Sequence, residues 1–151
     1  MKRPRRPAPR ARSRPSGAAR PVEPAGWLAP RGYSHGMVAP AGSRLLAIAG
    51  QVAWDEGARI VSDDFVEQFA RALENVRTVL AAAGGRPEHL LRLTFYVTDR
   101  EEYRRACKAI GERYRAILGR RYVACTLVEV RALLEPGARV EIEATAALPG
   151  A

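Results

Sequence analysis

The sequence predicts an α+β domain in which two helices cover one face of a mixed β-sheet. From Tyr33 onward, strand-like and helix-like segments follow one another in the order ββαβαββ. Both helical segments are amphipathic, and the segments are separated by turns rich in glycine or proline. A chain of 151 residues with 47% hydrophobic content is long enough to bury the core of one such domain.

The first two strands are predicted in SHGMVAP (34–40) and RLLAIAGQVAW (44–54). Both are short strand-like runs. The Ala41-Gly42 pair between them suits a tight turn, so we expect these strands to form a hairpin.

The first helix is predicted within residues 63–85. Apolar residues recur there every three or four positions, as expected for one buried helix face. Asp64 and Glu67 have the spacing of a capping box, and Gly84-Gly85 ends the pattern. The buried face is expected to consist of Phe65, Phe69, Leu73, Val76, Leu80 and Ala83.

A strand (89–99) and a second helix (98–119) are predicted next. The strand is rich in β-branched and aromatic residues. Thr98 and Glu101 have the spacing of a second capping box, and Gly119 is the predicted stop. One face of this helix is expected to carry Tyr103, Cys107, Ile110, Tyr114 and Ile117.

Two strands (121–130 and 138–148) are predicted to close the domain. Pro136-Gly137 between them suits the centre of a type II turn. In the last strand the side chains alternate, so that two sets of residues are expected on opposite faces. One set is Val140, Ile142, Ala144 and Ala146, and the other is Glu141, Glu143 and Thr145.

The strand at 45–52 is apolar at both odd and even positions. Strands of this kind are normally buried on both faces of a sheet. Two helices can cover only one face, so we expect a second copy of the chain to cover the other. The sequence therefore predicts a closed homo-oligomer, with ligand clefts where subunits meet.

Residues 1–26 are predicted to be a disordered basic tail, and residues 27–151 to be the folded domain. The tail is rich in proline and arginine and has few large apolar residues. Residues 1–25 hold eight of the 25 basic residues and one of the 16 acidic residues, which leaves 17 against 15 in the rest. We therefore expect contact with nucleic acid, if there is any, through the tail; a solvated extension is the preferred interpretation.

Other composition signals narrow the function classes. No apolar run approaches the ~20 residues that span a bilayer, so no membrane association is expected. The two cysteines, Cys107 and Cys125, have no spacing typical of a disulfide framework or a metal site. We expect a cytoplasmic protein without bound metal.

Five stretches together resemble the RidA/YjgF family, whose members also carry the name L-PSP endoribonuclease. They are GYSHGM, AGQV, ALENVRTVLAAAGG, YVTD and LVEVRALLEPGARVEIEATA, and the likeness covers about residues 32–148. It implies a chorismate-mutase-like fold, a homotrimer and three clefts between subunits. For the best understood branch it implies hydrolysis of enamines and imines, such as 2-aminoacrylate, to a keto compound and ammonia, without any cofactor.

The resemblance also suggests site residues. Tyr33 matches the family's cleft tyrosine, Gly50 matches the glycine of its second-strand motif, and Glu141 matches the glutamate that holds the attacking water. Cys107 stands where the family has an asparagine. Where the deaminase branch reads Pro-Ala-Arg-Ser, this chain has Cys125 in place of the arginine that binds the substrate carboxylate.

The loss of that arginine is worth roughly 1.5–3 kcal/mol of carboxylate binding. Another cation could replace it, with Arg121, Arg131 and Arg44 as candidates; otherwise the ligand is not a 2-imino acid, or the activity is weak. The main-chain N–H groups at Thr126 and Leu127 and the Thr126 hydroxyl are predicted to orient a polar ligand.

The same residues also have structural interpretations. Cys125 would be a small wall residue, His35 would hydrogen-bond across a subunit boundary, and Glu141 and Glu143 would be satisfied by Arg92 or Arg139. Three function classes remain open: an enamine or imine hydrolase, a metabolite-binding module with the same cleft and, ranked last, an RNA-directed activity.

Overall fold

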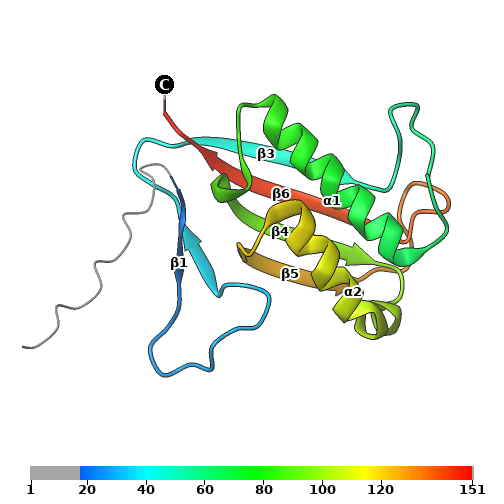
Figure 1. The fold of residues 1–151 in the computed structure, drawn as a ribbon, viewed down its shortest axis with the longest axis horizontal. Helices are drawn as coiled ribbons and strands as arrows, with labels where there is room; N and C mark the ends of the chain where they lie inside the picture. The colour runs from blue at the N-terminus through cyan, green and yellow to red at the C-terminus, as the bar shows by residue number, and fades with distance from the viewer. Residues whose placement is uncertain (1–17, 151) are drawn as a thin grey trace, which may run out of the picture.

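The computed structural model describes residues 18–150 (Figure 1). The strands are β1 (Arg20–Val22), β2 (Gly36–Val38), β3 (Arg44–Gln51), β4 (Leu90–Val97), β5 (Ala124–Glu129) and β6 (Val140–Leu148). The helices are α1 (Phe65–Ala82) and α2 (Arg100–Leu118), with a single 3-10 turn at Pro87–His89. Neither α-helix in the described range is long and apolar enough to cross a membrane.

The main sheet has four strands in the order β3-β6-β4-β5. β4 and β5 run parallel, whereas β6 is antiparallel to both of its neighbours. Figure 1 shows α1 and α2 side by side on one face of this sheet. The predicted α+β class, with a mixed sheet and two helices on one face, is confirmed.

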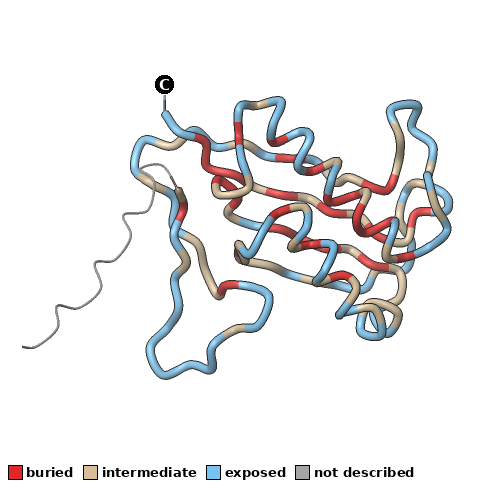
Figure 2. Tube along the Cα trace, viewed as in Figure 1, coloured by how far each residue is buried: buried red, intermediate tan, exposed pale blue. Residues whose placement is uncertain are grey.

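The core lies between this sheet and the two helices (Figure 2). β6 alternates as predicted: Val140, Ile142 and Ala144 are buried, whereas Glu141 and Glu143 are only partly covered. We call the face that carries these glutamates the open face, because no helix of the described chain covers it.

The helix ends follow the predicted chemistry with one correction. The Asp64 side chain accepts a hydrogen bond from the Glu67 N–H at 2.9 Å and caps α1, as predicted. The cap of α2 is Asp99 rather than Thr98, because the Asp99 carboxylate accepts from the N–H groups of both Glu101 and Glu102. An ionised carboxylate satisfies two free donors at once and suits the positive end of the helix dipole.

The predicted hairpin of the first two strands is wrong. A turn is present, because Ser43 N–H bonds to Pro40 O at 3.4 Å and Gly42 has φ of 76°. The strands that flank it nevertheless belong to different sheets: β3 pairs with β6, and β2 pairs with β1. Turn residues set the local chain reversal, but the partner of each strand is chosen by long-range pairing.

β1 lies within the segment that we expected to be disordered. Residues 1–17 are outside the described residues, but β1 pairs with β2 in a small separate sheet. Arg121 also donates to Ala19 O at 2.6 Å, and Ala19 is fully buried. Main-chain pairing and one long side chain therefore connect residues 19–22 to the rest of the described chain, and the boundary between tail and domain stays a prediction. We call residues 18–38 the arm.

The turn before β6 is tied to α1 by a buried glutamine. The predicted type II turn is present, with Gly137 at φ of 82° and Ala138 N–H bonded to Glu135 O at 3.1 Å. Gln68 is fully buried, and its amide group makes three hydrogen bonds of 2.8–2.9 Å to main-chain atoms. It donates to Ser62 O and Gly137 O and accepts from Arg139 N–H.

The open face exposes apolar side chains in the single chain. Leu45 is 75% exposed, while Ile48, of opposite parity on β3, is buried against the helices. Ala47 and Ala49 share the face of Leu45 and are also exposed. Burial of β3 on both sides is thus not achieved within one chain, and its cover by a second copy stays a prediction.

Candidate functional site

The predicted site residues fall into two groups on opposite faces of the main sheet. Cys125 and Leu127 point toward the helices, where they line a cavity with Cys107 of α2. Gly50 and Glu141 lie at a shallower hollow on the open face. Thr126 alternates with Cys125 along β5, is exposed and lines neither space.

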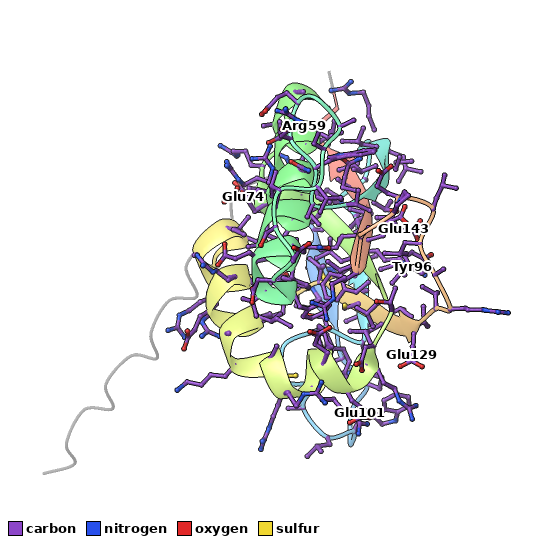
Figure 3. The ribbon with its side chains drawn as sticks, turned by 90° about the vertical axis from the view of Figure 1, so that its right-hand side faces the viewer. Arg59, Glu74, Tyr96, Glu101, Glu129 and Glu143 are labelled. Atoms are coloured by element: carbon purple, nitrogen blue, oxygen red, sulfur yellow. The ribbon has the colours of Figure 1, made fainter. Side chains whose placement is uncertain are left out.

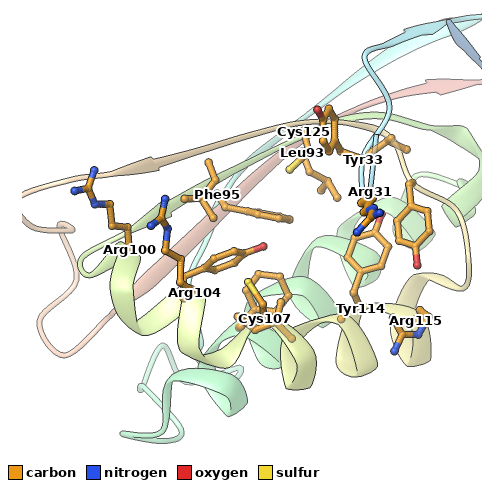
Figure 4. A pocket seen from close by; sticks show the side chains of 18 residues that line it. Arg31, Tyr33, Leu93, Phe95, Arg100, Arg104, Cys107, Tyr114, Arg115 and Cys125 are labelled. Carbon is orange, nitrogen blue, oxygen red and sulfur yellow. The ribbon is translucent and has the colours of Figure 1, made fainter. Parts of the chain in front are cut away.

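The first group lines a cavity of about 700 Å³ between α2, β4, β5 and the arm (Figure 4). Its floor is apolar, because alternate residues of β4 and β5 project toward the helices and meet Phe69 of α1. Tyr114 and Tyr122 stack at the wall, with ring centroids 5.6 Å apart. The apolar floor consists of Phe69, Leu93, Phe95, Ile110, Val123 and Leu127.

Burial keeps one thiol and two phenols of this cavity, those of Cys125, Tyr103 and Tyr114, in their neutral forms. Burial raises the pKa of the Cys125 thiol to about 11, with Arg92 acting weakly in the opposite direction. Burial also raises the pKa of Tyr103 to about 12, and it raises that of Tyr114 as well. A nucleophilic Cys125 would need a base or a cation close to its sulfur, and His35 does not line this cavity. The interpretation of Cys125 as a small wall residue is therefore favoured over a nucleophile.

Four arginines line the cavity, and the sequence reasoning missed all of them. They are Arg31 of the arm and Arg100, Arg104 and Arg115 of α2. The expected candidates lie elsewhere: Arg44 Nε donates to Pro149 O, and neither Arg121 nor Arg131 lines the cavity. The spacing of the α2 arginines was an available signal, since intervals of four and eleven residues return to one side of a helix.

The arm holds Tyr33 at the cavity. Ser34 N–H bonds to Val123 O at 2.9 Å, and the Ser34 hydroxyl donates to Tyr122 O at 2.8 Å. Next in the chain, His35 Nδ1 lies 2.5 Å from the carboxylate of Glu23. The His35 ring meets Tyr33 edge-on, with centroids 5.5 Å apart. His35 thus positions the arm within the chain; a bond across a subunit boundary remains a prediction.

The second group surrounds Glu141 on the open face. A Cβ placed on Gly50 would stand only 2.7 Å from Glu141 Cδ, so the absent side chain of Gly50 makes room for the carboxylate. Tyr96 OH donates to Glu143 Oε1 at 3.1 Å, which raises the pKa of Tyr96. Figure 3 shows Tyr96 and Glu143 on the side of the sheet away from both helices.

Glu141 has no ion pair with any residue in the range 18–150. Neither Arg92 nor Arg139 forms an ion pair with Glu141 or Glu143 within residues 18–150. Arg139 instead binds Glu102 of α2 at 2.5 Å, and Glu143 accepts a hydrogen bond from Tyr96. Glu141 is therefore a carboxylate held over a glycine with its acceptor atoms available. Within the described chain, no cluster of three or more histidine, cysteine or acidic residues is arranged to hold a metal ion.

The burial of Cys125 leads to a prediction for thiol chemistry. With a pKa of about 11, about 0.1% of the Cys125 thiol is ionised at pH 8, and only the thiolate is nucleophilic. Iodoacetamide at pH 8 is therefore expected to label the exposed Cys107 at least tenfold faster than Cys125. Mass spectrometry of tryptic peptides measures both rates. Equal labelling in folded protein would contradict the burial of Cys125, and equal labelling in urea is the control.

Comparison with known proteins places this chain and its fold in a family. The family model called Endoribonuclease L-PSP matches residues 27–148. Protein DfrA of Myxococcus xanthus is 32% identical over 115 residues, which cover 76% of this chain and 83% of that protein. Among solved structures, the Rid family protein YyfB of Yersinia pestis is 32% identical with a TM-score of 0.77, covering 87% of this chain and 99% of that one.

A second solved structure extends the likeness. Rv2704 of Mycobacterium tuberculosis, described as a member of the YjgF/YER057c/UK114 family, is 31% identical with a TM-score of 0.58, covering 78% of this chain and 87% of that one. Both the sequence match and the fold agree with this family. This chain belongs to the RidA/YjgF family, the family whose model is named Endoribonuclease L-PSP.

Proposed function

We propose that the protein hydrolyses enamine or imine compounds in clefts formed where copies of the chain meet, as a homotrimer. The observation that carries this proposal is the division of the site residues between the two faces of one sheet. A paired sheet lies between Glu141 and the cavity of Cys125, so one copy does not bring both groups to one ligand. A second copy can place its open face, with Glu141, against the first copy's cavity.

The chemistry assigned to this cleft is modest. An enamine takes up a proton on carbon and becomes an imine, and water then attacks the electrophilic carbon of the C=N bond. Glu141 of one copy orients that water and accepts its proton. That proton passes to the imine nitrogen, which gives a carbinolamine. The proton of the new hydroxyl group then passes to the same nitrogen, the C–N bond breaks, and the products are a carbonyl compound and ammonia. Tyr33 of the other copy closes the cleft, and the steps require no metal or organic cofactor.

Gly50 tests the position of Glu141 without removing it. In Gly50→Ala the new methyl group takes the space of the Glu141 carboxylate, which must move away from the water. We expect hydrolysis to fall about tenfold or more, because a displacement of about 1 Å is costly in catalysis. The free energy of unfolding, measured in urea, should change by less than about 1 kcal/mol, because only the flexible end of the Glu141 side chain is displaced. Unchanged hydrolysis would show that this contact does not set the geometry.

A metabolite-binding module without turnover is the second candidate. It is favoured by the cavity itself, where the Cys125 thiol and the Tyr103 phenol have pKa values of about 11 and about 12 and so stay neutral near pH 7. In this case ligand binding would persist, but no variant of Glu141 would alter a reaction rate. The two candidates therefore differ in turnover rather than in affinity.

The decisive experiment measures turnover directly. An amino-acid oxidase would form imino acids in situ, with semicarbazide present as a trap for the free imine. If the proposal is right, added protein speeds the release of keto acid from at least one imine and lowers the amount of that imine trapped by semicarbazide. No acceleration with any imine, together with retained ligand binding, would replace hydrolysis by the binding-module function. Light scattering measures the molar mass of the protein in solution. A mass near 16.5 kDa, that of one chain, would exclude a cleft between copies.

The name of the matched family model invites an RNA test. The positive charge of the sequence is concentrated in residues 1–25, so we expect RNA retention to depend on that segment. A variant without these residues should neither retain nor cleave RNA after a high-salt wash. Cleavage by that variant would make the RNA-directed activity the leading candidate.

A further inference from the structure

The cavity beside Cys125 combines an apolar floor with cations from two sides. Its lining contains the four arginines named above and no carboxylate from the described chain. Figure 4 shows Arg31 and Arg115 on the Tyr114 side of the cavity, with Arg100 and Arg104 on the opposite side near Phe95. A cavity of this construction attracts anions at its edge and apolar groups at its floor.

The two pairs of arginines differ in what they already bind. Arg100 and Arg104 lie 3.5 and 3.6 Å from the carboxylate of Glu101, which partly offsets the positive charge of both. Neither Arg31 nor Arg115 has a carboxylate partner within residues 18–150. Arg115 is also only partly exposed and lies over Gly111, where a Cβ would stand 3.2 Å from its Nη1.

The floor is suited to the opposite end of a ligand. Leu93, Phe95 and Phe69 are almost fully buried beneath the cavity, and Phe69 and Phe95 meet edge-to-face with centroids 5.2 Å apart. The Cys125 thiol beside them is neutral and small. No charged group lies at the position where the deaminase branch carries its arginine. An acid group placed there would be desolvated without a partner, which is costly.

We propose that this cavity selects organic acids with an aromatic or branched apolar body, and binds them with the acid group on Arg31 and Arg115 and the body on the floor beside Cys125. The acid group thus binds at the edge of the cavity, through the arm and the last turns of α2, rather than at β5. That these acids are substrates rests on the proposed function. Their binding to the cavity can be measured with unreactive acids, without any hydrolysis.

Binding of three unreactive probes tests the ligand class. We expect 3-phenylpropanoate to bind at least tenfold more tightly than propanoate, because the floor takes up the phenyl group. It should also bind at least tenfold more tightly than 3-phenylpropan-1-ol, which has the same body without the charge. Calorimetry measures all three. Equal binding of propanoate, or of the alcohol, would overturn the proposal.

Four single variants test the orientation. Arg31→Gln and Arg115→Gln should each weaken 3-phenylpropanoate about tenfold, while Arg104→Gln should weaken it less than threefold. Arg105→Gln is the matched control, because Arg105 is an exposed arginine of the same helix that does not line the cavity. An Arg104→Gln or Arg105→Gln effect equal to that of Arg115→Gln would overturn the assigned position of the acid group.

NMR provides a second readout that does not depend on charge. The phenyl ring of bound 3-phenylpropanoate should shift the methyl signals of Leu93 and Leu127, whereas binding in the reverse orientation would leave them nearly unchanged. Failure of imine hydrolysis with these binding results intact would reject the proposed reaction alone. Hydrolysis of small imines with no preference for apolar acids would reject only the inference about ligand class.

Discussion

Glu141→Gln is expected to lower kcat/KM for imine hydrolysis by about 10²–10⁴-fold, the range typical of a lost general base. Glutamine has the size of glutamate and can still bond to water, but it does not accept the proton that water loses. Glu141 is well placed for the role, since it lies over Gly50 and has no ion pair within the described chain. Steady-state kinetics with imines formed in situ would measure the loss.

Glu143→Gln is the matched control for this experiment. It changes the same chemical group two residues further along β6, where the carboxylate accepts from Tyr96 OH at 3.1 Å. We expect turnover within about threefold of the unchanged protein, and binding of 3-phenylpropanoate should be the same in both variants. Equal losses of turnover in the two variants would point to a general electrostatic effect of the open face. Full activity of Glu141→Gln would exclude Glu141 as the base.

Gln68→Met is expected to destabilise the fold by about 2 kcal/mol, because a buried polar group left without a partner costs roughly 1–3 kcal/mol and the three partners of the fully buried Gln68 amide are only partly buried. Methionine has nearly the same shape but neither donates nor accepts as an amide does. The variant strands Ser62 O, Gly137 O and Arg139 N–H, which the Gln68 amide now satisfies. Urea unfolding, followed by circular dichroism, would measure the loss.

The control for Gln68 is Glu74→Gln, an exposed change on the same helix, which should alter stability by less than about 0.5 kcal/mol. A loss below 1 kcal/mol in Gln68→Met would mean that water replaces the amide.

Gln68 also connects α1 to the turn that leads into β6 and Glu141. Gln68→Met protein that remains folded is therefore expected to hydrolyse imines more slowly. Its binding of 3-phenylpropanoate in the more distant cavity beside Cys125 should be unchanged.

The sequence by itself determined the elements of the main sheet and the helices. Periodicity fixed the buried faces of α1 and β6, because the residues at these spacings must share one side of a helix or strand. Local chemistry fixed most of the ends, such as the Asp64 cap and the type II turn at Pro136-Gly137. The family motifs suggested Tyr33, Gly50 and Glu141 as site residues, but not how they lie relative to Cys125.

Only the tertiary structure decided the partners of the strands and the composition of the site. Strand pairing depends on distant segments, so the turn at Gly42 joins two sheets instead of forming a hairpin. The cavity draws Arg31 from the arm and Arg115 from α2, 84 positions apart in the printed sequence. Such a meeting leaves no local pattern. Alternation along each strand places Cys125 and Glu141 on opposite faces of one sheet, and this is the physical reason to expect a second copy in the complete site.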